Sequence, residues 1–209
     1  MSDFSEFMEK GGKMMAKKDD LKSLILGILN ECGEIPKVKL AKLILFSEIE
    51  HFKKTGHSIT NLYFVRLKRG PVIAFFDDVL EEHTGTNWNK RINEIPIHEE
   101  GRSKQQFLYS AAEKATLPLA VQETVNEVCR EFGKKTGTEL SVLSHQLPAW
   151  KYSEPNEPIF VSELTVETDK EYFEFMDLVD ELEEVSDDDE DRVLGQELSR
   201  NIPAAEIRV

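Results

Sequence analysis

The segment LSHQLPAW, residues 143–150, holds the side chains whose types and spacing come nearest to catalytic chemistry. A serine near a histidine can act in nucleophilic catalysis, with His145 as the base and Ser141 or Ser144 as the nucleophile. The segment comes without an identifiable acid partner or an oxyanion-loop signature. The alternative is the end of a helix, which Pro148 stops and against which the Trp150 indole packs with its N–H hydrogen-bonded. We favour this helix end, in which His145 bonds a carbonyl, and a surface for a protein partner is the third interpretation.

The second segment that could do chemistry is RGPV, residues 69–72. Gly70 can adopt a positive φ and Pro71 suits the first position of a helix, so the segment predicts a corner between a strand and a helix. A helix N-terminus can bind an anion, and the basic stretch at 66–69 precedes this one. One glycine without a GxxxxGK[ST] or GxGxxG pattern is a weak phosphate signal, so we favour a solvated corner.

Helical periodicity dominates the chain and must position both segments. Apolar spacing predicts helices over 19–33, 37–56, 72–83, 117–133, 136–150 and 171–184, and alternating patterns predict strands at 61–67, 88–98 and 105–110. Thr136, three residues before Glu139, predicts a capping box at the start of the helix that carries LSHQLPAW. The expected fold class is mainly α, a compact helical domain with a small antiparallel β-sheet or hairpin insert, a C-terminal helix and an acidic tail.

The domain organisation follows from changes in pattern along the chain. We expect residues 1–18 to be a flexible N-terminus, because KGGK at 10–13 should break a helix there. Residues 19–152 form the helical domain, and 153–185 form a linker with an amphipathic helix. Residues 186–209, with the acid block SDDDED, are expected to be a disordered tail.

The amphipathic helix near the C-terminus has two interpretations. Its apolar side chains fall on one face, at Tyr172, Phe175, Val179 and Leu182. Such a helix docks on its own domain or lies in the groove of a partner, and these residues are the contacts that it would then supply. The acid block beyond it is usually only solvating, while binding of a basic partner or recognition by a protease are the alternatives.

Charge and composition exclude several classes of protein. The chain has 209 residues and a net charge of −14; residues 151–209 hold 19 acidic and 5 basic side chains, whereas residues 1–150 hold 21 of each. A neutral body lacks the broad positive surface that neutralises phosphates, so nucleic acid is not an expected partner. The longest apolar runs, such as 24–29, are far shorter than the roughly 20 residues that cross a bilayer, so we expect no membrane association.

The cysteines and the N-terminus indicate a cytoplasmic protein. The first 20 residues have no apolar stretch after their positive charges and do not resemble a secretory signal. Cys32 and Cys129 lie at apolar helix positions, where reduced, packed thiols are expected, and a disulfide between them stays open. The sequence has no CxxC motif and no Cys/His cluster, so we expect neither a metal nor another cofactor.

Three motifs in order carry a resemblance to a known family. The first motif is KLAKLILFSEIEHFKKTGHSI (39–59), the second is RGPV (69–72), and the third is the helix motif LSVLSHQLPAW (140–150). Over residues 20–152 the chain resembles the SocA-like Panacea domain family, which includes phage-associated GepA-type proteins. The matching residues are Leu40, Lys42, Leu43, Leu45, Phe46, His51 and Gly56, then Gly70, Pro71 and Val72, then Leu140, Leu143, Ser144, His145 and Trp150.

The resemblance implies an antitoxin-type protein that neutralises a cognate toxin by direct binding and has no catalytic activity. The founding member hands its toxin to the ClpXP protease, so an AAA+ protease is a second expected partner. The residues assigned by this resemblance to partner binding or to the family motif are Gly70, Pro71, Val72, Ser144, His145, Pro148 and Trp150. Two alternatives stay open: a DNA-binding autoregulator that uses helices around 37–54, and a hydrolase that uses Ser144 and His145.

Overall fold

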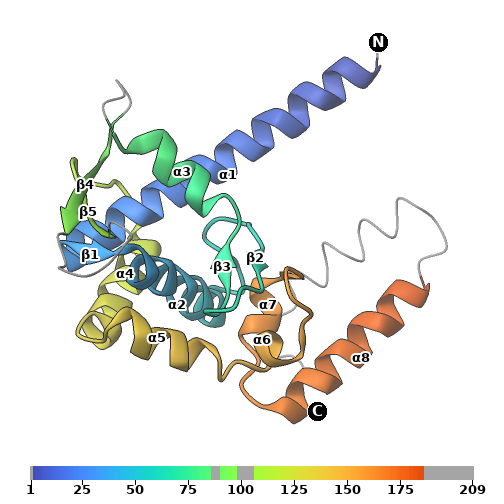
Figure 1. Cartoon of the computed structure of the whole chain (residues 1–209). Coiled ribbons are helices and arrows are strands. Elements are labelled where there is room, and N and C mark those ends of the chain that lie inside the picture. Colours follow the sequence, from blue (N-terminus) through green and yellow to red (C-terminus); the bar gives the residue numbers. More distant parts are fainter. Residues whose placement is uncertain (1, 86–89, 98–105, 186–209) are drawn as a thin grey trace.

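The computed structural model describes the backbone of residues 2–85, 90–97 and 106–185, and side chains between residues 13 and 179 within those ranges. In these residues the chain is mainly helical with short antiparallel strands, as the sequence predicts (Figure 1). The helices are α1 (Ser2–Cys32), α2 (Lys37–Thr55), α3 (Phe76–His83), α4 (Leu119–Phe132), α5 (Gly137–Ser144), α6 (Pro148–Tyr152), α7 (Val161–Leu164) and α8 (Asp169–Val185). The strands are β1 (Ile35–Pro36), β2 (Phe64–Val65), β3 (Val72–Ile73), β4 (Ile92–Ile97), β5 (Gln106–Ala111) and β6 (Pro158–Ile159).

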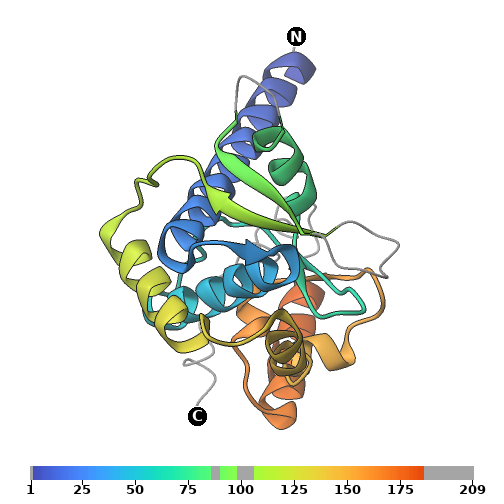
Figure 2. The ribbon, with the colours of Figure 1, turned by 60° about the vertical axis from the view of Figure 1, so that its left-hand side comes forward.

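Helix α2 is the centre of the fold. Of its 19 residues, 12 are buried, because α1, α4, α5, α7 and β3 all pack against it. The run LAKLILF is apolar except for Lys42, and a helix with so wide an apolar surface is stable only when it is enclosed. Figures 1 and 2 show α2 with α1, α4 and α5 arranged around it.

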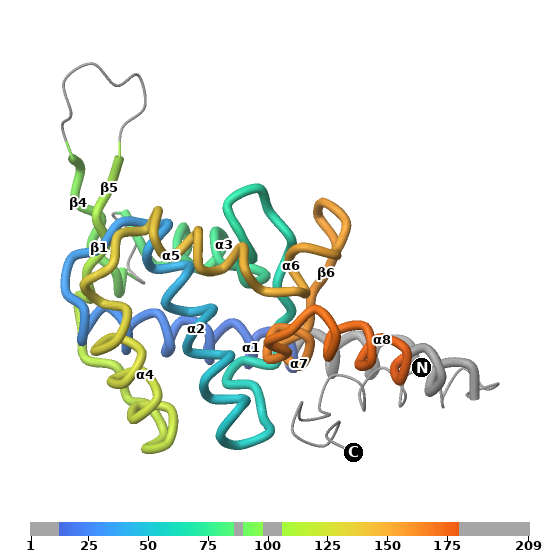
Figure 3. The backbone as a smooth tube through the Cα atoms, turned by 90° about the horizontal axis from the view of Figure 1, so that it is seen from below, coloured from blue at the N-terminus to red at the C-terminus, as the bar shows by residue number. Residues whose placement is uncertain are grey.

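The strands form two three-stranded sheets within the described residues, not the single sheet that we expected. In the order β1-β5-β4, residues 92–97 pair with 106–111, as the strand patterns at 88–98 and 105–110 predict, and this hairpin lies at one end of the helical body (Figure 3). In the order β3-β2-β6, Phe64 pairs with Ile73 and with Ile159. Strands β3 and β6 each have two residues, which is too short to leave an alternating pattern in a sequence.

Helix α1 corrects the expectation for the N-terminus. It begins at Ser2 and continues through both glycines of KGGK (10–13), where we expected a break. A helical glycine costs about 1 kcal/mol relative to alanine, which weakens a helix without stopping it. Flexibility of residues 1–18 in solution stays a prediction, and the predicted disorder of 186–209 concerns residues outside the described part.

The expected helix over 72–83 begins only at Phe76. Val72 and Ile73 lie in β3, because their β-branched side chains favour an extended strand that pairs with β2. Pro71 therefore lies in a hairpin turn and not in the first turn of a helix. The segment RGPV joins two strands and does not begin a helix. The interpretation of RGPV as an anion site at a helix N-terminus therefore has no geometric basis.

Candidate partner-binding site

The family motifs seen in the sequence meet at one buried place, which we call the corner: Lys42 from α2, Gly70 and Pro71 from the β2–β3 turn, and Ser144 from α5. The Nζ of Lys42 donates a hydrogen bond of 2.7 Å to the carbonyl oxygen of Pro71. A Cβ added to Gly70 would overlap the Oγ of Ser144 and lie 2.7 Å from the Nζ of Lys42. Gly70 also has a φ of 94°, so conformation and space both require glycine here.

Lys42 is the member of the corner that the sequence-based site assignment missed. Its side chain is almost fully buried, and burial lowers the pKa of Lys42 to about 7. A lysine within the otherwise apolar run LAKLILF is the signal that the sequence offers for this role, beyond the match of Lys42 to the family pattern. The buried amine fastens α2 to the β2–β3 turn through the carbonyl of Pro71.

The environment of Ser144 favours a structural role for its hydroxyl group. Its side chain is fully buried, and its Oγ donates a 2.8 Å hydrogen bond to the carbonyl oxygen of Ser141, one turn earlier in α5. Because a hydroxyl carries one proton, this bond leaves none to donate to His145. The hydrolase alternative therefore has a nucleophile that is neither exposed nor hydrogen-bonded to its base.

An aromatic stack fastens α5 and α6 to the β2–β3 hairpin. The rings of His145 and Trp150 lie 3.9 Å apart and nearly parallel, and the guanidinium of Arg66 lies 4.8 Å from the Trp150 ring. Arg66 Nε donates to the carbonyl oxygen of Trp150, and the indole Nε1 donates a 3.0 Å bond to the carbonyl oxygen of Leu67. His145 hydrogen-bonds the backbone of Arg69, as expected for a helix end.

The pKa of the His145 imidazole lies below its ordinary value, which favours the neutral ring. Burial lowers its pKa, and the nearby cations Lys42 and Arg66 lower it further, against the opposing effect of the Arg69 backbone. Its Nε2 is buried and has no hydrogen-bond partner among the described residues. A neutral ring stacked on an indole is suited to packing, and this favours the structural interpretation of His145.

The way α5 ends differs in one respect from the prediction. The capping box of Thr136 and Glu139 is confirmed at the start of α5, but the helix ends at Ser144, before Pro148 is reached. Pro148 is instead the first residue of α6, where its fixed φ suits a helix and its missing N–H costs nothing. Trp150 consequently lies within α6, whereas the sequence predicts that it follows the end of a single helix, which Pro148 stops.

The exposed rim of the corner is the turn of the β2–β3 hairpin, residues 67–69, which we call the hairpin tip. Leu67 is 39% exposed, and Lys68 and Arg69 are also exposed. The N–H of Gly70 donates to the carbonyl oxygen of Leu67 and closes the turn. The turn thus presents one exposed apolar side chain followed by two exposed cations. Contacts with α2, α5 and α6 fix the position of the turn.

Helix α8 docks on its own domain through part of its predicted contact face. Tyr172 and Phe175 are buried, and Val179 is partly buried against the same core. The side chain of Leu182 lies outside the described residues. In this arrangement the buried pair packs on the chain's own domain, and a role of this helix in binding a partner stays a prediction.

Several further expectations concern whole classes of function. The DNA-binding alternative needs an accessible helix around 37–54, but α2 is enclosed by its neighbours. Among the described residues, no group of three or more His, Cys, Asp or Glu side chains is arranged to hold a metal ion. In the same part of the chain, no helix combines the length and apolar character that a membrane span requires.

Comparison with protein-family models matches residues 40–151 to the family described as Antitoxin SocA-like, Panacea domain. The matched segment is more than half of the chain and contains every residue of the corner and of the aromatic stack. Searches of the curated proteins and of the solved structures match nothing.

Proposed function

The chain belongs to the SocA-like antitoxin family with a Panacea domain, and we propose that it neutralises a cognate toxin by direct protein–protein binding. The observation that carries the proposal is that the family match contains all the segments that meet at the corner. The buried serine and neutral stacked histidine of the corner favour binding over catalysis. We expect no catalytic activity and no cofactor requirement for neutralisation.

The hairpin tip is our proposed toxin contact. Leu67 is an exposed apolar side chain, and Lys68 and Arg69 beside it are exposed cations. This combination suits a partner with an apolar pocket bordered by carboxylates. Because the corner already fixes the turn, binding would cost little conformational entropy.

In this proposal the motif residues, buried or half-buried, act by holding the hairpin tip in place. Gly70 permits the close approach of the turn to α2 and α5. Lys42 and the stack of His145 on Trp150 tie the turn to α2, α5 and α6. Pro148 starts α6, the helix that carries Trp150. The residues with this role are Lys42, Gly70, Pro71, Val72, Ser144, His145, Pro148 and Trp150. Substitutions that displace the turn, such as Gly70→Ala, would weaken toxin binding together with stability.

The narrower form of the proposal is that the chain delivers its toxin to a ClpXP-type AAA+ protease. The alternative is that binding alone blocks the toxin. The acidic tail at 186–209 is the segment that we propose for a contact with the protease. Removal of the tail should be made after residue 185, because a cut at 168 would also remove the buried Phe175.

The experiment is affinity capture with the tagged full-length chain at native expression in its host, read by mass spectrometry. We expect one stoichiometric protein that arrests growth when it is expressed alone and is tolerated when the chain is co-expressed. Capture of an AAA+ subunit by the full chain but not by residues 1–185 would support delivery. A captured protein that is harmless alone, or an empty eluate, would contradict the antitoxin proposal.

A further inference from the structure

The two cysteines of the chain lie in contact between α1 and α4. The Sγ atoms of Cys32, the last residue of α1, and Cys129, in the last turn of α4, are 2.7 Å apart although the residues are 97 positions apart in sequence. Both are free thiols and both are partly exposed. The pair is therefore close enough to react and accessible to a small oxidant.

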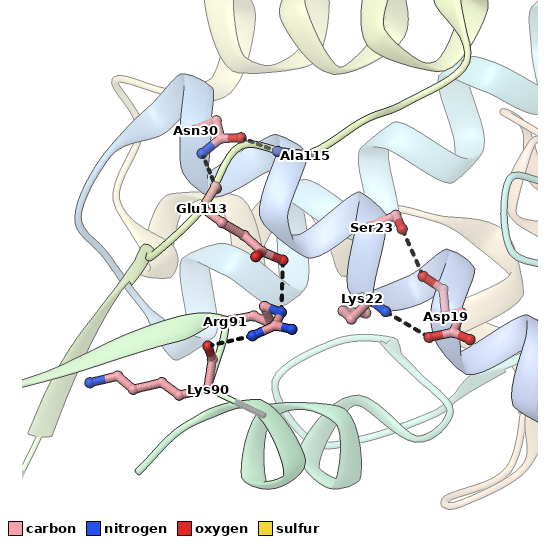
Figure 4. A network of polar contacts seen from close by, with 8 residues as sticks. All are labelled: Asp19, Lys22, Ser23, Asn30, Lys90, Arg91, Glu113 and Ala115. Carbon is pink, nitrogen blue, oxygen red and sulfur yellow. Dashed lines mark hydrogen bonds and ion pairs between the residues drawn. The ribbon is translucent and has the colours of Figure 1, made fainter. Parts of the chain in front are cut away.

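The surrounding contacts hold α4 against α1 and so keep the thiols together. The amide of Asn30, two residues before Cys32, donates to the carbonyl oxygen of Glu113 and accepts from the N–H of Ala115 (Figure 4). Glu113 is itself paired with Arg91 at 3.0 Å, which anchors the same segment to the strand region. The segment that leads into α4 is thus tied to the last turn of α1.

A close approach of apolar groups supports the same interface. A Cβ on Gly27 of α1 would overlap the Cδ1 of Leu117, just before α4, so a larger residue there would require the Leu117 side chain to move. The last turn of α4 is held as well, because the Nζ of Lys39 donates to the carbonyl oxygen of Gly133. The cysteines therefore meet across a packed interface and not across a loose surface.

The two thiols are chemically different. The hydrogen bond between the two thiols lowers the pKa of the Cys32 thiol, and the charge of Lys39 lowers it further against the opposing effect of burial. The same hydrogen bond and burial raise the pKa of Cys129. Since the thiolate is the nucleophile, this difference favours Cys32 as the attacking thiol and Cys129 as the resolving thiol.

We propose that Cys32 and Cys129 form a reversible disulfide when the chain meets a peroxide. The Cys32 thiolate attacks one peroxide oxygen, the O–O bond breaks, and hydroxide leaves, so that Cys32 becomes a sulfenic acid. The Cys129 sulfur then attacks the Cys32 sulfur, and its proton leaves with the hydroxyl group as water. The two thiols lose two electrons to the peroxide, and a dithiol reductant returns them by thiol–disulfide exchange.

The disulfide would join α1 to α4 around the long loop that contains α2 and both strands of the β2–β3 hairpin. Closing a long loop restricts the unfolded chain more than closing a short one, so the oxidised form should unfold at a higher temperature. Slower unfolding would also slow proteolysis of the opened chain. This inference concerns the lifetime of the chain and does not depend on the toxin or on the hairpin tip.

The test treats the reduced, full-length chain with hydrogen peroxide and follows intact mass, thiol titration and thermal unfolding. We expect the mass to fall by about 2 Da, as two hydrogens are lost on disulfide formation. Both thiols should disappear from the titration, the melting temperature should rise, and a dithiol should reverse all three changes. Two remaining thiols, a disulfide between two chains, or direct oxidation of Cys32 to sulfinic acid would overturn the proposal.

Matched single variants assign the two roles. Cys129→Ser should accumulate a sulfenic acid at Cys32, trapped by dimedone, while Cys32→Ser should react much more slowly at its remaining thiol. Circular dichroism of the reduced variants shows whether each has folded. If both variants react with peroxide at the same rate, the assignment of Cys32 as the attacking thiol is wrong.

Discussion

Gly70 shows why one residue type is required at the corner. Gly70→Ala should lower the free energy of unfolding by about 3 kcal/mol, partly from its positive φ and mainly from the overlap with Ser144. Gly33 has a similar φ of 71° but open space around it, so Gly33→Ala isolates the conformational cost of about 1 kcal/mol. Urea denaturation compares the two, and equal losses would contradict the steric argument.

Lys42 should make stability depend on pH in a definite direction. Its pKa is about 7 in the folded chain against 10.5 ordinarily, so the unfolded chain binds the proton first as the pH falls. The contribution of this group to stability is therefore full above pH 10.5, is lost as the pH falls toward 7, and stays constant below 7.

Lys42→Met tests this dependence with a side chain of similar length. The variant should be about 3 kcal/mol more stable than the parent at pH 6, because about 5 kcal/mol of charge burial is relieved and part of this is offset by the lost bond to Pro71. The advantage should shrink or reverse at pH 9.5. A difference that is the same at both pH values, measured by urea denaturation, would count against a titrating lysine.

At the scale of elements, the docking of α8 depends on one buried aromatic side chain. Phe175→Ala should lower the free energy of unfolding by about 3–5 kcal/mol, because a fully buried ring is lost from the core. Phe173, two residues earlier on the same helix, is 49% exposed, and Phe173→Ala should cost less than about 1 kcal/mol. Similar losses for both would show that α8 is not docked as described.

Helix α7 carries a second pH dependence with the opposite sign. Burial raises the pKa of Glu163 from 4.5 to about 7, against the hydrogen bond that its carboxylate accepts from Phe160 N–H. The folded chain therefore holds the proton more tightly, and this stability is full below pH 4.5 and lost as the pH rises through 7.

Glu163→Gln removes this titration while its amide oxygen can still accept from Phe160. The variant should gain about 3 kcal/mol relative to the parent at pH 8 and little at pH 4.5. Thermal or urea unfolding at the two pH values checks the expectation. An equal gain at both values would indicate a packing effect and not the loss of a buried charge.

At the scale of the whole molecule, the sequence predicts elements whose pattern is long and misses those that depend on distant partners. The periodic runs of α2 and α4 and the alternating strands β4 and β5 are recognisable because each pattern spans several turns or residues. The two-residue strands β3 and β6 exist only because β2 lies between them in space. The late start of α3 follows from that same pairing, which residues 72–75 alone do not reveal.

The candidate site was predictable in its members but not in its geometry. The motifs with Gly70, Ser144, His145 and Trp150 were identified from residue types and order. That a glycine makes room for a lysine and a serine from two other helices follows only from packing between segments far apart in sequence. Lys42 is not recognisable from the sequence as a member of the site, because a lysine in a helix is expected to face solvent unless the helix is enclosed as α2 is.

The central claim is that the corner presents the hairpin tip to a toxin. The most direct measurement compares the affinity of the captured toxin for Leu67→Asp and for Leu119→Asp, which places the same change on an exposed leucine of α4. The account predicts at least about tenfold weaker binding for Leu67→Asp, typical of a contact at the centre of an interface, and unchanged binding for Leu119→Asp. Unchanged binding by the hairpin-tip variant, with both variants folded, would contradict it.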